Sequence, residues 1–180
     1  MGTVGRRALA GVAVLGGALA PFAGSPYRAQ RARVDVDRLA SAVAREEDHV
    51  TAVELAQWIR DRKAGLRVID LRSPEAFDAG HVPGAQNVAI TALSTTPFRD
   101  DETVVLVSDG GGHAAQGWVF LQALGHREAY FLRGGMAEWM DDVMSPVAGR
   151  QPAPALTRYF GGSLREEGAP RPTGPRRGGC

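Results

Sequence analysis

The chain has 180 residues, of which 44% are hydrophobic and 23% charged, and its formal net charge is +1. That length allows one domain of roughly 100–150 residues with a real core, plus terminal segments. Residues 1–34 hold five arginines and no acidic residue, residues 146–180 hold six arginines and two glutamates, and the middle therefore carries −8. Because nucleic-acid binding needs clustered Lys and Arg on the folded surface, this acidic body argues against a nucleic-acid partner.

The N-terminus has the pattern of an export signal. Residues 1–24 place Arg6 and Arg7 before an apolar run from Ala8 to about Ala23. A membrane span needs about 20 apolar residues, so this shorter run predicts a signal peptide or, alternatively, a short signal anchor, and no stable membrane span. Residues 25–34 are then a polar spacer. We therefore expect an exported protein, in a bacterial periplasm or on the outer face of the membrane.

Residues 35–145 are expected to form the folded domain, in which helices and strands alternate. In chain order we expect a helix over 35–44, a helix after Thr51, a strand over 66–72, a helix over 73–80, an extended segment over 81–90, a strand over 102–108, a helix over 113–125, a strand over 128–135 and a helix over 136–143. Glu54, three residues after Thr51, completes a capping box. The most apolar strand, "ETVVLVS", should be central, and the alternation predicts an α/β fold with a parallel sheet covered on both faces.

The C-terminal segment, residues 146–180, is rich in Pro, Gly and Arg and has no periodicity, which predicts a mostly disordered tail. Within it, "LTRYFGG" (156–162) is expected to fold back onto the domain or, alternatively, to dock a partner. Cys180 is the only cysteine, so no internal disulfide is possible. It is either an ordinary terminal thiol, a disulfide link to a second copy, or a sulfur carrier whose thiolate is favoured by nearby arginines.

Four segments occur in order: "HVTAVELAQWI" (49–59), "VIDLRSPEAFDAGHVPGAQN" (68–87), "VVLVSDGGGHAAQGWVFLQALG" (104–125) and "AYFLRGGMAEW" (129–139). Together they resemble the single-domain rhodanese family of thiosulfate or persulfide sulfurtransferases. The resemblance implies a three-layer α/β domain with a central parallel sheet and helices on both faces. It also implies a catalytic cysteine at the end of the central strand, where a cradle of backbone N–H groups holds the persulfide.

Counting back from Gly125, Ser108 matches the position of that cysteine, Asp109 follows it, and His113 falls where an arginine is common. A loop before a helix N-terminus, here expected near residues 113–115, does stabilise anions. However, a serine hydroxyl lacks the nucleophilicity of a thiolate and cannot hold a sulfane sulfur. The added carboxylate and the lost arginine also weaken a site for thiosulfate. The three changes together imply lost catalysis.

The loop is expected to keep a concave pocket for a small group, since glycines permit positive φ and close approach; the alternative is a flexible linker without a pocket. Asp70 and Arg72 follow a strand and should face the loop, where they either set its charge or fix the turn as an ion pair. The candidate pocket residues are Ser108, Asp109, Gly110, Gly111, Gly112, His113, Asp70 and Arg72. The expected partner is a small anion, or a protein that docks at the loop or the tail.

Other chemistries fit the sequence less well. A serine hydrolase built on Ser108 and His113 lacks the G-x-S-x-G elbow, and a cysteine phosphatase needs the missing thiolate. The four histidines show no ligand spacing, so we expect no metal and no cofactor. The sequence thus predicts an exported rhodanese-like binding or regulatory module. The alternatives are a sulfurtransferase or thiol-redox protein that uses Cys180, and a protein that acts only through interactions of its tail.

Overall fold

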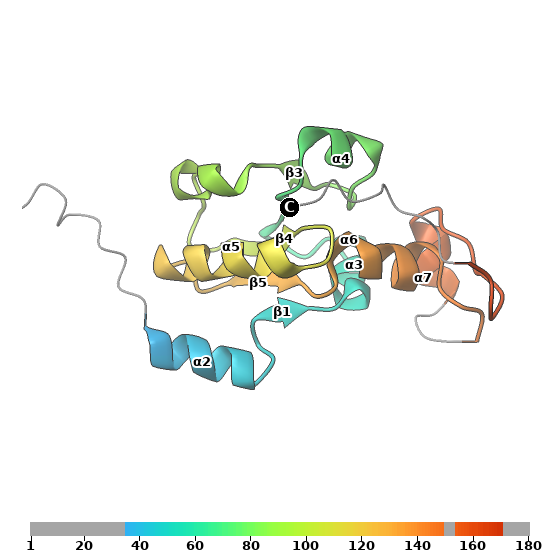
Figure 1. The fold of residues 1–180 in the computed structure, drawn as a ribbon, viewed down its shortest axis with the longest axis horizontal. Coiled ribbons are helices and arrows are strands. Elements are labelled where there is room, and N and C mark those ends of the chain that lie inside the picture. The colour runs from blue at the N-terminus through green and yellow to red at the C-terminus, as the bar shows by residue number, and fades with distance from the viewer. Residues whose placement is uncertain (1–34, 150–153, 171–180) are drawn as a thin grey trace, which may run out of the picture. The chain divides into compact units, whose positions relative to one another are not determined.

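The computed structural model describes residues 35–149 and 154–170 (Figure 1). The predicted signal and spacer and the Cys180 thiol lie outside the described residues. Five parallel strands form one sheet in the order β1-β5-β4-β2-β3. The strands are β1 (His49–Val50), β2 (Leu66–Asp70), β3 (Gln86–Asn87), β4 (Thr103–Val107) and β5 (Ala129–Leu132). The prediction of an α/β fold with a central parallel sheet is confirmed.

Helices connect the strands. They are α2 (Val36–Ala44), α3 (Ala52–Arg60), α4 (Pro74–Ala79), the 3₁₀ helix η2 (Ile90–Thr95), α5 (Gly112–Ala123), α6 (Gly135–Glu138), the π-helix η3 (Trp139–Met144) and α7 (Pro154–Tyr159). The predicted capping box of α3 is present: Thr51 Oγ1 accepts from the Glu54 N–H, and the Glu54 carboxylate accepts from the Thr51 N–H. Over residues 35–149 and 154–170, no helix is long and apolar enough to cross a membrane.

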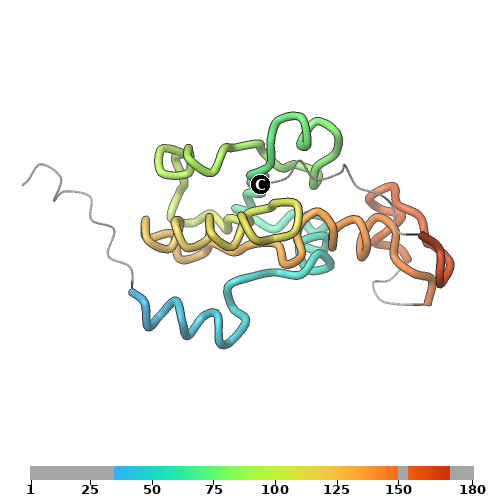
Figure 2. Tube along the Cα trace, in the orientation of Figure 1, coloured from blue at the N-terminus to red at the C-terminus, as the bar shows by residue number. Residues whose placement is uncertain are grey.

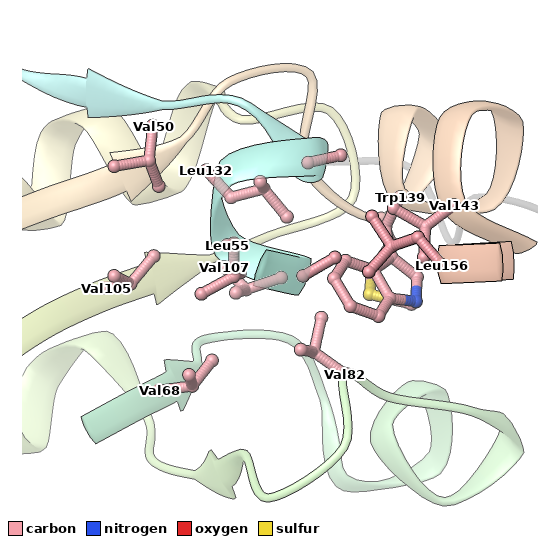
Figure 3. Close-up of a cluster of buried hydrophobic side chains, with 13 residues drawn as sticks. Val50, Leu55, Val68, Val82, Val105, Val107, Leu132, Trp139, Val143 and Leu156 are labelled. Atoms are coloured by element: carbon pink, nitrogen blue, oxygen red, sulfur yellow. The ribbon is translucent and has the colours of Figure 1, made fainter. Parts of the chain in front are cut away.

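Strand β4 is the centre of the core. All five of its residues are buried, and their side chains alternate between the two faces of the sheet. Val105 and Val107 join a cluster with α3, α6 and η3 (Figure 3), whereas Val104 and Leu106 join a second cluster with α5 and η2. Helices thus cover both faces, and α5 lies alongside β4 and β5 (Figure 1). Burial on both faces explains why "TVVLV" is continuously apolar.

Two local expectations are wrong at their boundaries. The segment after β3 is not extended to its end but turns into η2 at Ile90, where Leu93 buries its side chain in the cluster with α5. Helix α5 begins at Gly112, before the expected residues 113–115. Its N-cap, Gly111, has a φ of +86°, which a residue without a side chain adopts at no steric cost, so the helix can start directly after it.

The expectation of disorder is wrong for residues 154–170, and the expectation that residues 156–162 fold back onto the domain is confirmed. Figure 2 shows the chain of α7 beside η3, in agreement with their contacts. Leu156 is 3% exposed and joins the cluster of Trp139 and Val143. The Phe160 ring lies 5.3 Å from that of Trp139, and the Ser163 N–H donates to the Met144 carbonyl at 2.9 Å. Residues 154–163 are therefore packed onto the hydrophobic core.

Leu156→Ala is predicted to lower the free energy of unfolding by about 2–5 kcal/mol, because it leaves a cavity beside Trp139. The matched control is Leu164→Ala, since Leu164 is 45% exposed in the same segment and should change stability by about 0.5 kcal/mol or less. Urea denaturation of the full chain measures both values. Equal effects of the two variants would contradict a core role for α7.

Candidate functional site

The candidate site lies where β2, β4 and β5 end. Parallel strands bring their carboxyl ends to the same edge of the sheet, and α/β folds commonly bind ligands there. Ser108 follows β4 directly and is 4% exposed. Its Oγ accepts a hydrogen bond from the Ala114 N–H, in the first turn of α5, at 3.2 Å. The Ser108 hydroxyl therefore points inward and satisfies one of the free amides of the helix N-terminus.

The loop from Ser108 to Gly111 is fixed by the turn between β5 and α6. The Met136 N–H donates to the Ser108 carbonyl at 2.9 Å, and the Ala137 N–H donates to the Asp109 carbonyl at 3.1 Å. Gly135 has a φ of +57°, and a Cβ atom there would overlap the Ser108 carbonyl oxygen. The loop backbone is thus held in one shape by hydrogen bonds and by close glycine contacts.

Asp70 and Arg72 form a buried ion pair at the end of β2. Arg72 Nε donates to both carboxylate oxygens of Asp70, at 3.0 and 3.1 Å, and Arg72 Nη2 donates to Asp70 Oδ2 at 2.7 Å and to the Gly80 carbonyl at 2.6 Å. The two side chains are 2% and 0% exposed. Asn87 Nδ2 donates to the carbonyls of both residues. The turn-fixing role that the sequence left open for this pair is therefore present in the structure.

Asp109 faces the same guanidinium from the loop. Its Oδ1 lies 3.8 Å from Arg72 Nη1, and its side chain is 54% exposed. This contact joins Asp109 at the loop to Asp70 and Arg72 at the end of β2. Of the predicted pocket residues, Ser108 and Gly111 are buried, and Gly110, Gly112 and His113 are exposed on the loop and the first turn of α5.

The arrangement holds no nucleophile–base pair in the described residues. Ser108 Oγ is bonded to a backbone amide, and no hydrogen bond joins it to His113. His81 stacks on Phe77 with ring centroids 3.9 Å apart and shares a hydrogen bond with the Phe77 carbonyl, which is a structural role. Among residues 35–149 and 154–170, no group of three or more His, Cys, Asp or Glu side chains can hold a metal ion.

The sequence did not reveal four groups that support the site: the Gly80 carbonyl, the Asn87 side-chain amide, and the backbone amides of Met136 and Ala137 in the turn after β5. The Gly134–Gly135 pair was the available signal for the last two of these. The sequence also did not reveal a cavity of about 420 Å³ away from the loop, lined by residues that include Arg38, His49, Trp58, Trp118 and Tyr130. Trp118 is 4% exposed and donates from Nε1 to the Ala129 carbonyl, so it belongs to the core as well as to the lining of this cavity.

Gly135→Ala is predicted to disrupt the loop. An L-residue at positive φ costs roughly 1–2 kcal/mol, and the overlap with the Ser108 carbonyl adds about 1–3 kcal/mol. Gly84→Ala is the matched control, because Gly84 has a φ of +80° but nothing within 4 Å of a Cβ atom. Thermal unfolding and the amide NMR shifts of residues 108–114 report the difference. If both variants lose equal stability and leave these shifts unchanged, the close contact does not shape the loop.

Comparison with known proteins places these features in a family context. A family model described as "Rhodanese-like domain" matches residues 51–142. The chain is 28% identical over 103 residues to the probable adenylyltransferase/sulfurtransferase MoeZ of Mycobacterium tuberculosis strain H37Rv. The aligned region covers 55% of this chain and 26% of MoeZ. The chain is also 34% identical over 80 residues to the uncharacterized protein YqhL of Bacillus subtilis strain 168. This aligned region covers 43% of this chain and 62% of YqhL. The chain thus spans less than two thirds of either relative.

Solved structures give matches of the same kind. The human single-domain sulfurtransferase TSTD1 matches 51% of this chain and 94% of its own, with 25% identity and a TM-score of 0.47. A rhodanese-like domain protein from Staphylococcus aureus matches 52% of this chain and 92% of its own, also with 25% identity and a TM-score of 0.47.

Proposed function

The chain belongs to the rhodanese-like domain family, and we propose that it is a member without cysteine-based sulfurtransferase activity that acts as a binding or regulatory module. One observation carries the proposal: the residue that directly follows β4, beneath the N-terminus of α5, is Ser108, whose hydroxyl accepts from the Ala114 amide. We infer from the family resemblance that this is the position of the catalytic cysteine.

The chemistry of Ser108 supports this proposal. Sulfur transfer requires a thiolate that attacks the sulfur donor and then carries the sulfane sulfur as a persulfide. A hydroxyl is protonated at neutral pH, and an oxygen in its place forms no persulfide. A serine nucleophile also needs a general base within hydrogen-bond reach. The Ser108 hydroxyl is instead engaged by the Ala114 amide, and His113 is exposed.

The defined shape of the loop supports a binding role. The Asp70–Arg72 pair and the amides of Met136 and Ala137 hold the loop beside a strand edge that commonly binds ligands. A loop that is ordered without a thiol presents a fixed surface for a small group or for a segment of a protein partner. Exposed Asp109 and His113 are the side chains that such a partner would meet first.

Sulfur transfer from thiosulfate to cyanide tests the proposal. The purified full chain, Cys180→Ser and Ser108→Ala should all produce no thiocyanate above the buffer rate, beside an active rhodanese as the positive control. Thiocyanate from the wild type that is lost in Cys180→Ser would assign sulfur transfer to the terminal thiol. Activity that is lost in Ser108→Ala would contradict an inert serine.

We also propose that the protein is exported, on the sequence pattern of residues 1–24 alone. When the full chain is expressed in a bacterium, the protein is expected in the periplasmic or outer-face fraction. N-terminal sequencing should show that about the first 24 residues are missing. Recovery from the cytosol with Met1 or Gly2 at the N-terminus would contradict export, and recovery in the membrane fraction with an intact N-terminus would favour the signal anchor.

A further inference from the structure

Arg72 is a cation that the end of β2 holds in one place. Its Nε and Nη2 atoms donate hydrogen bonds to the Asp70 carboxylate, and Nη2 also donates to the Gly80 carbonyl. The Arg72 side chain is 2% exposed. Asn87 fixes the backbone on which both members of the pair stand. The guanidinium therefore cannot turn outward to meet a ligand, and what it offers toward the loop is Nη1.

The group that meets Nη1 is the carboxylate of Asp109. Asp109 Oδ1 lies 3.8 Å from Arg72 Nη1, within the range of an ion pair, while the rest of the Asp109 side chain is open to solvent. The Asp109 carbonyl is bonded to the Ala137 N–H, which fixes the backbone from which the carboxylate extends. The Asp109 carboxylate is thus an anion of the chain itself, and it lies beside the Nη1 atom that Arg72 directs toward the loop.

A second arginine near the loop is paired in the same way. Arg133 follows β5, in the turn that packs against Gly111, and its Nη2 lies 3.5 Å from Glu138 Oε1. Two arginines and three carboxylates, those of Asp70, Asp109 and Glu138, therefore stand at this strand edge, and their net charge is negative. A free anion that approached the loop would therefore meet arginines that are already paired, beside the exposed carboxylate of Asp109.

Building on the proposed function, we propose that the Asp109 carboxylate occupies the Nη1 edge of Arg72, which is the edge that faces the loop. By doing so it closes the loop to small anions. Asp109 thereby determines the ligand class of the site. Thiosulfate, sulfate and phosphate are excluded, and uncharged or cationic groups remain as the groups that a ligand or partner can present to the loop. The loss of thiosulfate chemistry then has two separate causes, the missing thiolate at Ser108 and the closed anion face at Arg72.

The test is the titration of the ¹⁵N-labelled full chain with sodium thiosulfate and, separately, sodium sulfate, at constant ionic strength. The amide shifts of residues 110–114 are followed. Asp109→Asn should show saturable shifts with a dissociation constant at least about tenfold lower than that of the wild type, because a charge close to the anion is removed. Asp109→Glu, which keeps the charge, should behave like the wild type.

Asp61→Asn is the matched control. Asp61 is exposed to a similar extent, 61% against 54%, and is also paired with an arginine, Arg60, but away from the loop. It should leave anion binding unchanged. The proposal is overturned if the wild type already saturates as tightly as Asp109→Asn, if Asp109→Asn gains no binding, or if Asp61→Asn gains as much. Wild-type anion binding as tight as that of Asp109→Asn, without thiocyanate formation, would overturn this inference alone, whereas thiocyanate formation by the wild type would overturn the proposed function.

Discussion

A guanidinium buried at the end of a strand has to be completely paired, and Arg72 imposes that constraint on the whole candidate site. An unpaired buried charge costs several kcal/mol, so the position of each partner is restricted. Asp70 supplies two oxygens from the last residue of β2, Gly80 supplies a carbonyl from the end of α4, and Asp109 approaches from the loop after β4. Three segments that are separate in the sequence are thereby held at one edge of the sheet.

The loop between β4 and α5 is shaped by contacts that are independent of the side chain at position 108. Its shape depends on backbone hydrogen bonds to Met136 and Ala137 and on the absence of a side chain at Gly135. None of these features requires a thiol at position 108. The serine hydroxyl even contributes to the same structure, because it accepts the hydrogen bond of the Ala114 amide. The loop is therefore held in a defined shape with serine at position 108.

The core extends past the part of the chain that resembles the family. The family match ends at residue 142, yet η3 continues to Met144 and α7 returns to bury Leu156 against Trp139. The hydrogen bond from the Ser163 amide to the Met144 carbonyl and the parallel bridge between Val147 and Arg165 tie these C-terminal residues to the end of η3. Helix α7 packs against α3 and η3, and Tyr159 and Leu164 are exposed on the outer side of this segment.

The sequence by itself determined the elements whose signals are local. The continuous apolar run of β4, the capping box of α3, the Ser73–Pro74 start of α4 and the alternation of helices and strands are each encoded within a few neighbouring residues. The sequence also places Ser108 and three glycines, Gly110 to Gly112, in the loop between β4 and α5. Only the tertiary structure decided the turn into η2, the choice between folding back and partner docking for α7, and the direction of the Asp109 carboxylate. These depend on Leu93, Leu156 and Arg72 finding partners from distant segments, and such contacts form only when the sheet has brought those segments together.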